Sequence, residues 1–277
     1  GGREVIEVTV PDEWKNAQVM ETKSDADSSA FINEVMNPMI RMDGDALPVS
    51  VFAKRPDGTF PQGTTAYEKR GVAINIPEWI SEHCIQCNQC SLVCPHAAIR
   101  PFLVNGEEKS AAPAGFATIA AKGKGLEGLE FRIQVSPLDC MGCGNCVEVC
   151  PAKQKALVMH PLESQMSQAP LWEYASTRVS YKDNLTPKTT VKGSQFAKPY
   201  FEFSGACAGC GETPYIKLVT QLFGKRMMIA NATGCSSIYC GSAPSTPFCT
   251  DIDGYGPSWA SSLFEDNAEY GYGMQLG

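Results

Sequence analysis

The sequence predicts an α+β fold, and three features of the chain lead to this prediction. Two similar cysteine-rich runs begin at Cys84 and Cys140, and each is followed by a short apolar strand candidate. Residues 161–199 are rich in Pro, Ser, Thr, Gln and Lys without hydrophobic periodicity, which is typical of an extended arm. From residue 200 onward, a capped helix is followed by an apolar strand, as in α/β domains. We therefore expect a cysteine-rich module that an arm joins to the beginning of an α/β domain.

The composition is that of a soluble globular protein with an unusual number of cysteines. Of 277 residues, 43% are hydrophobic and 19% are charged, and the net charge is −7. No apolar run is long enough to cross a bilayer, and the N-terminus lacks the pattern of a signal peptide. A cytoplasmic protein without membrane or nucleic-acid partners is expected, since acidic balance disfavours nucleic acid. The thirteen cysteines cluster at gaps of two or three residues, which favours metal ligation over disulfides.

The N-terminal part shows secondary structure but no recognisable chemistry. One strand is expected within residues 5–10. A helix is expected to begin at Ser28 or Ser29 and to end before Pro38, because proline removes a helical hydrogen-bond donor. Residues 47–65 are β-like in composition. These segments are interpreted as the end of a preceding domain and a small connecting domain.

The predicted organisation can be given as domains and elements. The domains are the end of a preceding domain (1–22), a connecting domain (23–61), a two-cluster module (62–180, with a surface insert near 105–128 and an arm) and the start of an α/β domain (181–277). The predicted strands run from Ile99 to Val104, Ala156 to Met159 and Arg226 to Ala232, and a helix runs from Thr213-Pro214 to Gly224. The α/β segment stops at Gly277 without closing an obvious fold, so the end looks truncated.

Both cysteine runs have the spacing Cys-x2-Cys-x2-Cys-x3-Cys-Pro, which is typical of a ferredoxin-like fold with two [4Fe–4S] clusters. In that arrangement three cysteines of one run bind one cluster, and the fourth cysteine binds the other cluster. A zinc site would use one pair of Cys-x2-Cys units per ion, so eight cysteines in two matching runs favour iron–sulfur. His83 and His96 flank the first run and are expected to surround a cluster without binding it, or to lie on the surface. The expected ligands are Cys84, Cys87, Cys90 and Cys150 for cluster one, and Cys140, Cys143, Cys146 and Cys94 for cluster two.

A third cysteine group lies in the α/β segment. Cys207 and Cys210 form one more Cys-x2-Cys directly before a helix start, where backbone N–H groups favour a thiolate or an anionic cluster. Cys235 follows an apolar strand, at the edge of a sheet where ligands bind in α/β folds. These three would supply three ligands of a third cluster. Cys240 and Cys249 are candidates for the fourth ligand, but each could equally be a buried structural thiol.

Several motifs together resemble the pyruvate:ferredoxin (flavodoxin) oxidoreductase family. They are Gly-Thr-Thr-Ala-Tyr-Glu-Lys-Arg-Gly (63–71), the two cysteine runs, Cys-Ala-Gly-Cys-Gly-Glu-Thr-Pro (207–214), Ala-Thr-Gly-Cys-Ser-Ser-Ile-Tyr (232–239) and Phe-Glu-Asp-Asn-Ala-Glu-Tyr-Gly-Tyr-Gly-Met (264–274). The resemblance covers essentially the whole chain, as an internal piece of a longer enzyme. It implies oxidative decarboxylation of pyruvate on thiamine diphosphate and Mg²⁺, with coenzyme A collecting the acetyl group. Electrons would pass through three [4Fe–4S] clusters to ferredoxin or flavodoxin, in a homodimer.

The resemblance also implies roles for single residues. Cys207, Cys210 and Cys235 match three ligands of a proximal cluster whose fourth ligand would lie beyond the chain. Glu212 and Cys235 match positions that contact thiamine diphosphate, although a carboxylate at a helix start is also ordinary helix stabilisation. The Gly-Asp-Gly…Asn motif for Mg²⁺ is absent from the sequence, and Asp251-x-Asp253-Gly254 is better interpreted as a turn.

We therefore expect the electron-transfer portion of a 2-oxoacid oxidoreductase, which should be inactive alone because most of the thiamine site and the pyruvate site lie elsewhere. The alternative is a stand-alone carrier of the polyferredoxin type.

Overall fold

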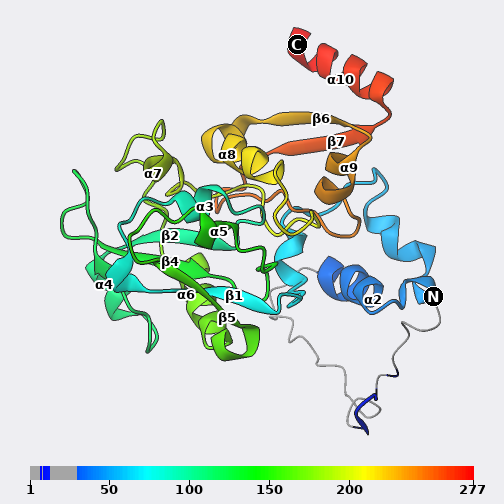
Figure 1. Ribbon diagram of the computed structural model, residues 1–277. Coiled ribbons are helices and arrows are strands. Elements are labelled where there is room, and N and C mark those ends of the chain that lie inside the picture. The colour runs from blue at the N-terminus through cyan, green and yellow to red at the C-terminus, as the bar shows by residue number, and fades with distance from the viewer. Residues whose placement is uncertain (1–6, 8, 13–29) are drawn as a thin grey trace.

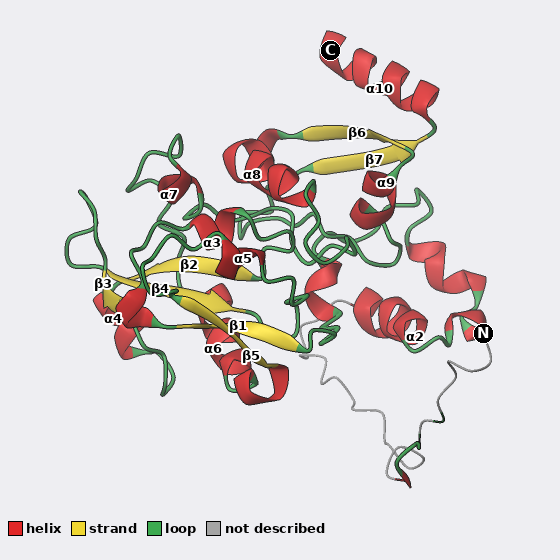
Figure 2. Cartoon of the chain, viewed as in Figure 1, coloured by secondary structure: helices red, strands yellow, loops and turns green. Residues whose placement is uncertain are grey.

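The computed structural model describes residues 7, 9–12 and 30–277, and shows a mixed α+β fold (Figures 1 and 2). The strand expected within 5–10 and the helix start at Ser28 or Ser29 fall largely outside these residues. The part that follows is helical. It comprises η1 (Ile32–Met36), α2 (Asn37–Ile40), η2 (Gly44–Ala46), η3 (Val49–Lys54) and η4 (Thr64–Tyr67).

Two predictions for this helical part are wrong. Pro38 does not end the helix, because a π-helical turn precedes it, in which the Asn37 N–H donates to the Ile32 carbonyl. Such a turn changes the hydrogen-bond pattern and lets the helix accept a proline in the first turn of α2. The segment 47–65 contains the 3₁₀-helix η3 and no strand, and Val49 is 88% exposed. The side chain of Val49 lies in solvent and has no sheet to pack against, so the β propensity of valine does not produce a strand here.

The cysteine module contains two small antiparallel sheets. β1 (Asn75–Trp79) pairs with β5 (Leu157–Pro161), and β2 (Ile99–Val104) and β3 (Ile119–Ala120) flank β4 (Glu130–Val135). The strands predicted at 99–104 and 156–159 are therefore confirmed. Short helices interrupt the strands: η5 (Ser81–His83), α3 (Gln89–Leu92), α4 (Gly106–Ser110) and α5 (Asn145–Glu148). The largest hydrophobic core lies here, and it includes Ile99, Leu126, Phe131, Ile133 and Leu157.

The insert near 105–128 is more than a surface excursion. It contributes β3 to the sheet, and Leu126 from it is completely buried in the main core. Its helix α4 begins with a capping box between Asn105 and Glu108. The insert thus completes one side of the module.

The extended arm expected over 161–199 is wrong for its first half. After η6 (Leu162–Gln165), the regular helix α6 (Gln168–Arg178) packs beside β4 and buries Leu171, Trp172 and Ala175 in two smaller hydrophobic clusters. The apolar side chains are few, but they lie on one side of the helix, where burial outweighs a polar composition. The second half, with α7 (Val191–Ser194), is mostly loop.

The C-terminal part is an α/β unit. The helix predicted from 213 and the strand predicted over 226–232 are confirmed as α8 (Thr213–Phe223) and β6 (Met228–Ala232), with η7 (Gly224–Arg226) between them. β6 pairs in parallel with β7 (Ser258–Ser262), and α9 (Cys235–Cys240) and α10 (Phe264–Leu276) complete the unit. Figure 1 shows this unit packed above the cysteine module. Among the described residues, no helix has the length and apolar character needed to span a membrane.

Candidate iron–sulfur sites

Two cavities in the cysteine module are each lined by four cysteines. One cavity is bordered by Trp79, Ile133 and Leu157 and by the sulfur-bearing residues Cys84, Cys87, Cys90 and Cys150. The other is bordered by Ile99 and His96 and by Cys94, Cys140, Cys143 and Cys146. These are the two crossed sets that the cysteine spacing predicts. We name the cavities site one and site two.

The crossing arises from two short helices that pack against each other. Cys94 follows α3 and Cys150 follows α5, so each fourth cysteine leaves its own loop and reaches the neighbouring cavity. The electrostatic neighbours agree with this grouping, because Cys84, Cys87 and Cys150 act on Cys90. Proximity of the two cavities follows from the contact between the helices.

The two cysteine loops share one backbone conformation although their sequences differ. Gln86 and Asn88 in the first loop have φ of 59° and 62°, and Gly142 and Gly144 at the matching positions have φ of 69° and 79°. Left-handed residues at both positions curl the loop so that three cysteines face one cavity. Glycine adopts this conformation freely, whereas glutamine and asparagine need support. The Gln86 amide supplies it by donating to the Ala120 carbonyl at 2.8 Å and accepting from the Lys122 N–H at 2.8 Å.

Cysteine thiols of both sites resist deprotonation, so they would become thiolates only together with a bound cation. Burial raises the pKa of Cys84, Cys90 and Cys146 above the ordinary value, and raises the pKa of Cys140 to about 12. Four thiolates around one apolar cavity would require a positive partner, which iron would supply as the thiols lose their protons. The donor sets of both sites therefore fit a [4Fe–4S] cluster, with four cysteine ligands each.

Two lysines occupy matching places behind the two loops, and sequence reasoning missed them both. The Lys217 ammonium donates to the carbonyls of Ser91, Leu92 (3.2 Å) and Cys94 (3.3 Å). The Lys155 ammonium donates to the corresponding carbonyls of the second run, those of Val147, Glu148 and Cys150, at 2.8 to 2.9 Å. Both lysines thus cap the end of a short helix beside a candidate ligand cysteine.

The two lysines differ in burial and origin. Lys217 comes from α8 and is 1% exposed, whereas Lys155 lies near its own loop and is exposed. Burial lowers the pKa of Lys217 to about 8, although negative charge on Cys94 opposes this effect. No local pattern in the sequence predicts the role of Lys217, because its partners lie more than a hundred residues away along the chain.

The third cysteine group lies in the C-terminal part. Cys207 and Cys210 are on the loop before α8, and Cys235 is the first residue of α9. Cys207 and Cys235 are exposed, and half-buried Cys210 packs against a core cluster that contains Tyr239 and Cys240 of α9. Burial raises the pKa of Cys210, but the backbone N–H groups of Thr213 and Glu212 bind its sulfur, and the net effect is a lowered pKa. The thiolate form of Cys210 is thus easier to reach than that of an ordinary thiol.

The loop with Cys207 and Cys210 lies directly beside site two. His96 is 2% exposed, and its ring nitrogens lie 3.2 Å from the Ser204 carbonyl and 3.3 Å from the Cys207 carbonyl. A Cβ built on Gly209 would lie 3.6 Å from Cβ of Cys143. His96 is therefore a buried residue of this junction. Of the two placements expected for it, the one on the surface is wrong.

The other candidates have more ordinary places. Cys240 and Cys249 are 2% and 6% exposed and belong to a core cluster or its surroundings, which fits structural thiols. Glu212 is exposed at the start of α8, and its negative charge reinforces the effect of burial that raises the pKa of Tyr239. Asp251 accepts the N–H groups of Asp253 and Tyr255, as expected of an Asx turn.

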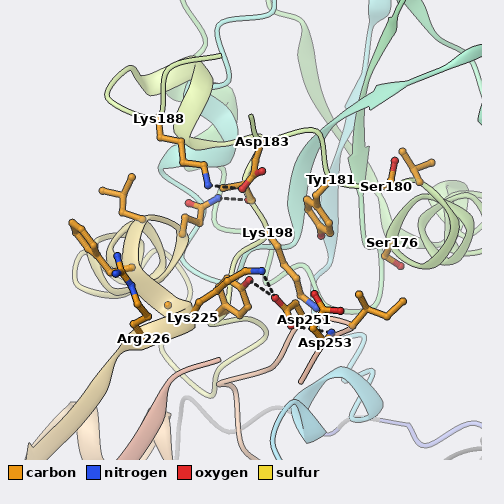
Figure 3. A pocket seen from close by; sticks show the side chains of 18 of the residues that line it. Ser176, Ser180, Tyr181, Asp183, Lys188, Lys198, Lys225, Arg226, Asp251 and Asp253 are labelled. Atoms are coloured by element: carbon orange, nitrogen blue, oxygen red, sulfur yellow. Dashed lines mark hydrogen bonds and ion pairs between the residues drawn. The ribbon is translucent and has the colours of Figure 1, made fainter. Parts of the chain in front are cut away.

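A cavity of about 640 Å³ has no cysteine in its lining. It lies between residues 176–188, the end of α8 and the Asp251 turn (Figure 3). Its lysines already have partners: Lys188 binds Asp183 at 2.5 Å, Lys225 binds Asp251 at 2.6 Å, and Lys198 donates to the Thr250 carbonyl at 2.6 Å. Of these contacts, only that of Lys198 with Thr250 connects the arm to the C-terminal part. Size alone does not make this cavity a functional site.

Comparison with known proteins gives two family matches and a group of close relatives. Residues 17–73 match the EKR family, described as a domain of unknown function, and residues 83–154 match a 4Fe–4S dicluster domain. A pyruvate-flavodoxin oxidoreductase of Enterobacter agglomerans is 59% identical over 277 residues, the whole of this chain. That of Klebsiella pneumoniae is 56% identical, and a pyruvate:ferredoxin oxidoreductase of Moorella thermoacetica is 59% identical, each over 98% of this chain.

The chain spans 23% of the length of each of these three relatives. Its identity to them extends from the EKR region through the dicluster domain to the end of the C-terminal α/β unit, so all three parts of the fold are included. The chain accordingly belongs to the pyruvate:ferredoxin/flavodoxin oxidoreductase family, as a segment that contains the EKR region and the 4Fe–4S dicluster domain.

Proposed function

We propose that this chain is the electron-transfer portion of an enzyme that oxidises pyruvate with coenzyme A and passes the electrons to ferredoxin or flavodoxin. The single observation that carries the proposal is the lining of sites one and two by two crossed sets of four cysteines. The names of the relatives supply pyruvate and the two acceptors. A [4Fe–4S] cluster, when bound in each site, supplies a one-electron carrier of low potential.

The chain's own residues hold these carriers and exclude water from them. The cysteines are positioned by loops with left-handed turns, and the apolar walls include Trp79, Ile133 and Leu157 at site one. Lys155 and Lys217 place positive charge behind the ligating loops. Apolar surroundings and nearby charge are the two means by which a protein sets a cluster's potential.

A third carrier is proposed at Cys207, Cys210 and Cys235, with a fourth ligand outside this chain. The support is the lowered pKa of Cys210 and the contact of its loop with α9, which Cys235 begins. Thiamine diphosphate with Mg²⁺, when bound nearby, would supply the chemistry that releases CO2 from the 2-oxoacid. Glu212 and Cys235 are proposed to contact it, from the exposed edge of the α/β unit.

The order of the carriers follows from their neighbours. Site two contacts the Cys207 loop through His96 and Gly209, so it would receive electrons first from the third carrier. Site one has no residue of this loop in its lining, and it lies beside Ile85, which is 53% exposed, and Lys192, whose pKa is affected by charge on Cys84 and Cys87. An apolar residue with a nearby cation suits docking of an acidic acceptor. Electrons would therefore leave at site one.

Iron analysis of the anaerobically purified protein tests the proposal. About eight iron atoms per chain are expected from sites one and two, and about twelve if the third carrier is also complete. Zinc in place of iron would overturn it. Two variants test the crossing: Cys94→Ser should remove cluster two although Cys94 belongs to the first run, and Cys150→Ser should remove cluster one. Electron paramagnetic resonance of the reduced protein distinguishes which signal is lost, and loss in the uncrossed order would refute the assignment.

A further inference from the structure

The segment 63–71 lies between the cysteine module and the C-terminal part, and we call it the joint segment. It comprises η4 and the residues Glu68-Lys69-Arg70-Gly71, at the end of the EKR match, for which no function is described. Thr64 and Thr65 in it are 1% and 2% exposed. Tyr67 and Arg70 are exposed, so the joint segment is buried at its two threonines and reaches the surface further along, between two parts of the fold.

On one side the joint segment binds the loop that leads into site two. The Lys69 ammonium lies 2.6 Å from Oδ2 of Asp139, whose side chain is only 2% exposed. Asp139 immediately precedes the ligand candidate Cys140 and also accepts the Ser136 hydroxyl at 2.6 Å. The N–H of Gly71 donates to the Leu138 carbonyl at 2.8 Å. The entry to the second cysteine loop is thus fixed by both a side chain and the backbone.

On the other side the joint segment binds the strand-like run before Cys207. Nη1 of Arg70 donates to the Ser204 carbonyl at 3.1 Å, and the Thr65 hydroxyl donates to the Glu202 carbonyl at 2.8 Å. Glu68 forms an ion pair with Arg70 and accepts the Ser245 hydroxyl, which orients the guanidinium. Three residues after Ser204 comes Cys207.

Adjacent residues therefore bind different loops. Lys69 has a φ of 44°, so the chain turns there. Its ammonium pairs with Asp139 and also lies 5.2 Å from the centre of the Phe203 ring, beside the Ser204 that Arg70 binds. Lys69 holds the loop of site two and Arg70 holds the loop of the third cysteine group. We propose that the joint segment is a clamp that fixes these two loops relative to each other and thereby sets the electron-transfer geometry between the third carrier and cluster two.

The clamp rests on the proposed function and adds a role to it. With both clusters bound, the step concerned would move one electron from the reduced third carrier to oxidised cluster two, without transfer of an atom or a proton. The rate of such a step falls steeply with the separation of the carriers, so a small displacement of either loop is costly. Lys69 and Arg70 touch neither carrier; they are positioning residues, which act through the loops that they hold.

The test compares Lys69→Met, Arg70→Met and the double variant with the unmodified protein, each as the intact protein. Lys54→Met is the matched control, because Lys54 pairs with Glu34 at 3.4 Å on the surface of the same part of the chain. Iron content, the spin–spin interaction between reduced clusters, and the freeze-quenched rate of cluster two reduction are measured. We expect unchanged iron, a weakened spin–spin interaction, and at least a tenfold slower reduction in the double variant. Lys69→Arg should restore the rate, whereas a double variant within twofold of the unmodified protein overturns the clamp.

Hydrogen exchange separates this proposal from the function on which it rests. In the cluster-free protein, Arg70→Met should increase exchange of residues 203–210, and Lys69→Met that of residues 136–143, at least fivefold in each case. Unchanged exchange in both segments refutes the clamp even if no cluster can be loaded. If the double variant does not fold, Thr65→Val removes one bond of the clamp with little change of shape and is measured instead. Absence of iron from the unmodified protein would count against the proposed function alone.

Discussion

Replacing Lys217 by methionine tests whether a buried cation tunes cluster two. Reduction adds one negative charge to a cluster, and the Lys217 ammonium is bound to the Cys94 carbonyl at 3.3 Å. A unit charge roughly 8 Å from the added electron contributes about 2 kcal/mol at an effective dielectric constant near 20. For a one-electron couple this corresponds to about 90 mV. Lys217→Met should therefore lower the reduction potential of cluster two by about 90 mV, with a smaller change at cluster one.

Lys155→Met is the control, because Lys155 makes the same three bonds in the second run but is exposed. Water screens its charge, so a shift below about 20 mV is expected. The loss in free energy of unfolding should likewise be larger for Lys217→Met than for Lys155→Met. Lys217→Met removes a charged donor from a buried site and should cost about 2–4 kcal/mol, whereas Lys155→Met should cost less than about 1 kcal/mol.

Redox titration followed by electron paramagnetic resonance measures the potentials, and chemical denaturation of the cluster-free protein measures stability. Iron content must match that of the unmodified protein in both variants. Equal shifts in the two variants, or none in Lys217→Met with full iron, would refute the argument that burial gives Lys217 its influence.

Three further changes test the loops and the third cysteine group. Gly142→Ala should destabilise the protein by about 2–3 kcal/mol, since its Cβ would lie 2.8 Å from a carbonyl of β1, whereas Gly144→Ala, with open space, should cost about 1 kcal/mol. Thermal unfolding compares the two. Gln86→Leu should cost about 1–2 kcal/mol through its lost bonds to the insert, as measured by denaturation. In cluster-free protein at pH 8, iodoacetamide should modify Cys210 faster than Cys240, because burial raises the pKa of Cys240 to about 12 while that of Cys210 is lowered; the reverse order would contradict this account.

The cysteine groups could be predicted because their geometry is encoded locally. Two-residue gaps fix which three sulfurs share a loop, and the three-residue gap carries Cys94 and Cys150 across to the other cavity. The helix α8 was equally visible, since Pro214 and Gly224 mark its two ends. Local signals of this kind need no knowledge of the rest of the fold.

The missed features depend on contacts between distant segments. Helix α6 has a polar composition, and only its packing on the sheet shows why Trp172 makes it stable. Lys217 looks like a solvent-facing lysine of an amphipathic helix, yet the carbonyls that bind it belong to residues 91–94. The joint segment likewise acts through Asp139 and Ser204, which no local pattern connects. Such partners become apparent only in three dimensions.

The two cysteine loops have nearly the same backbone conformation, but different segments of the chain surround them. This difference in surroundings gives the proposed electron path its direction. At the matching left-handed positions, the first loop has Gln86, held by the insert, and the second has Gly142, where Ala73 and the carbonyl of Asn75 leave no room for a side chain. Site two is therefore enclosed by the EKR region and the Cys207 loop, whereas site one is bordered by the insert and exposed Ile85. Two similar cysteine loops thus have different neighbours, and in the proposed path site two would receive electrons and site one would pass them to an acceptor.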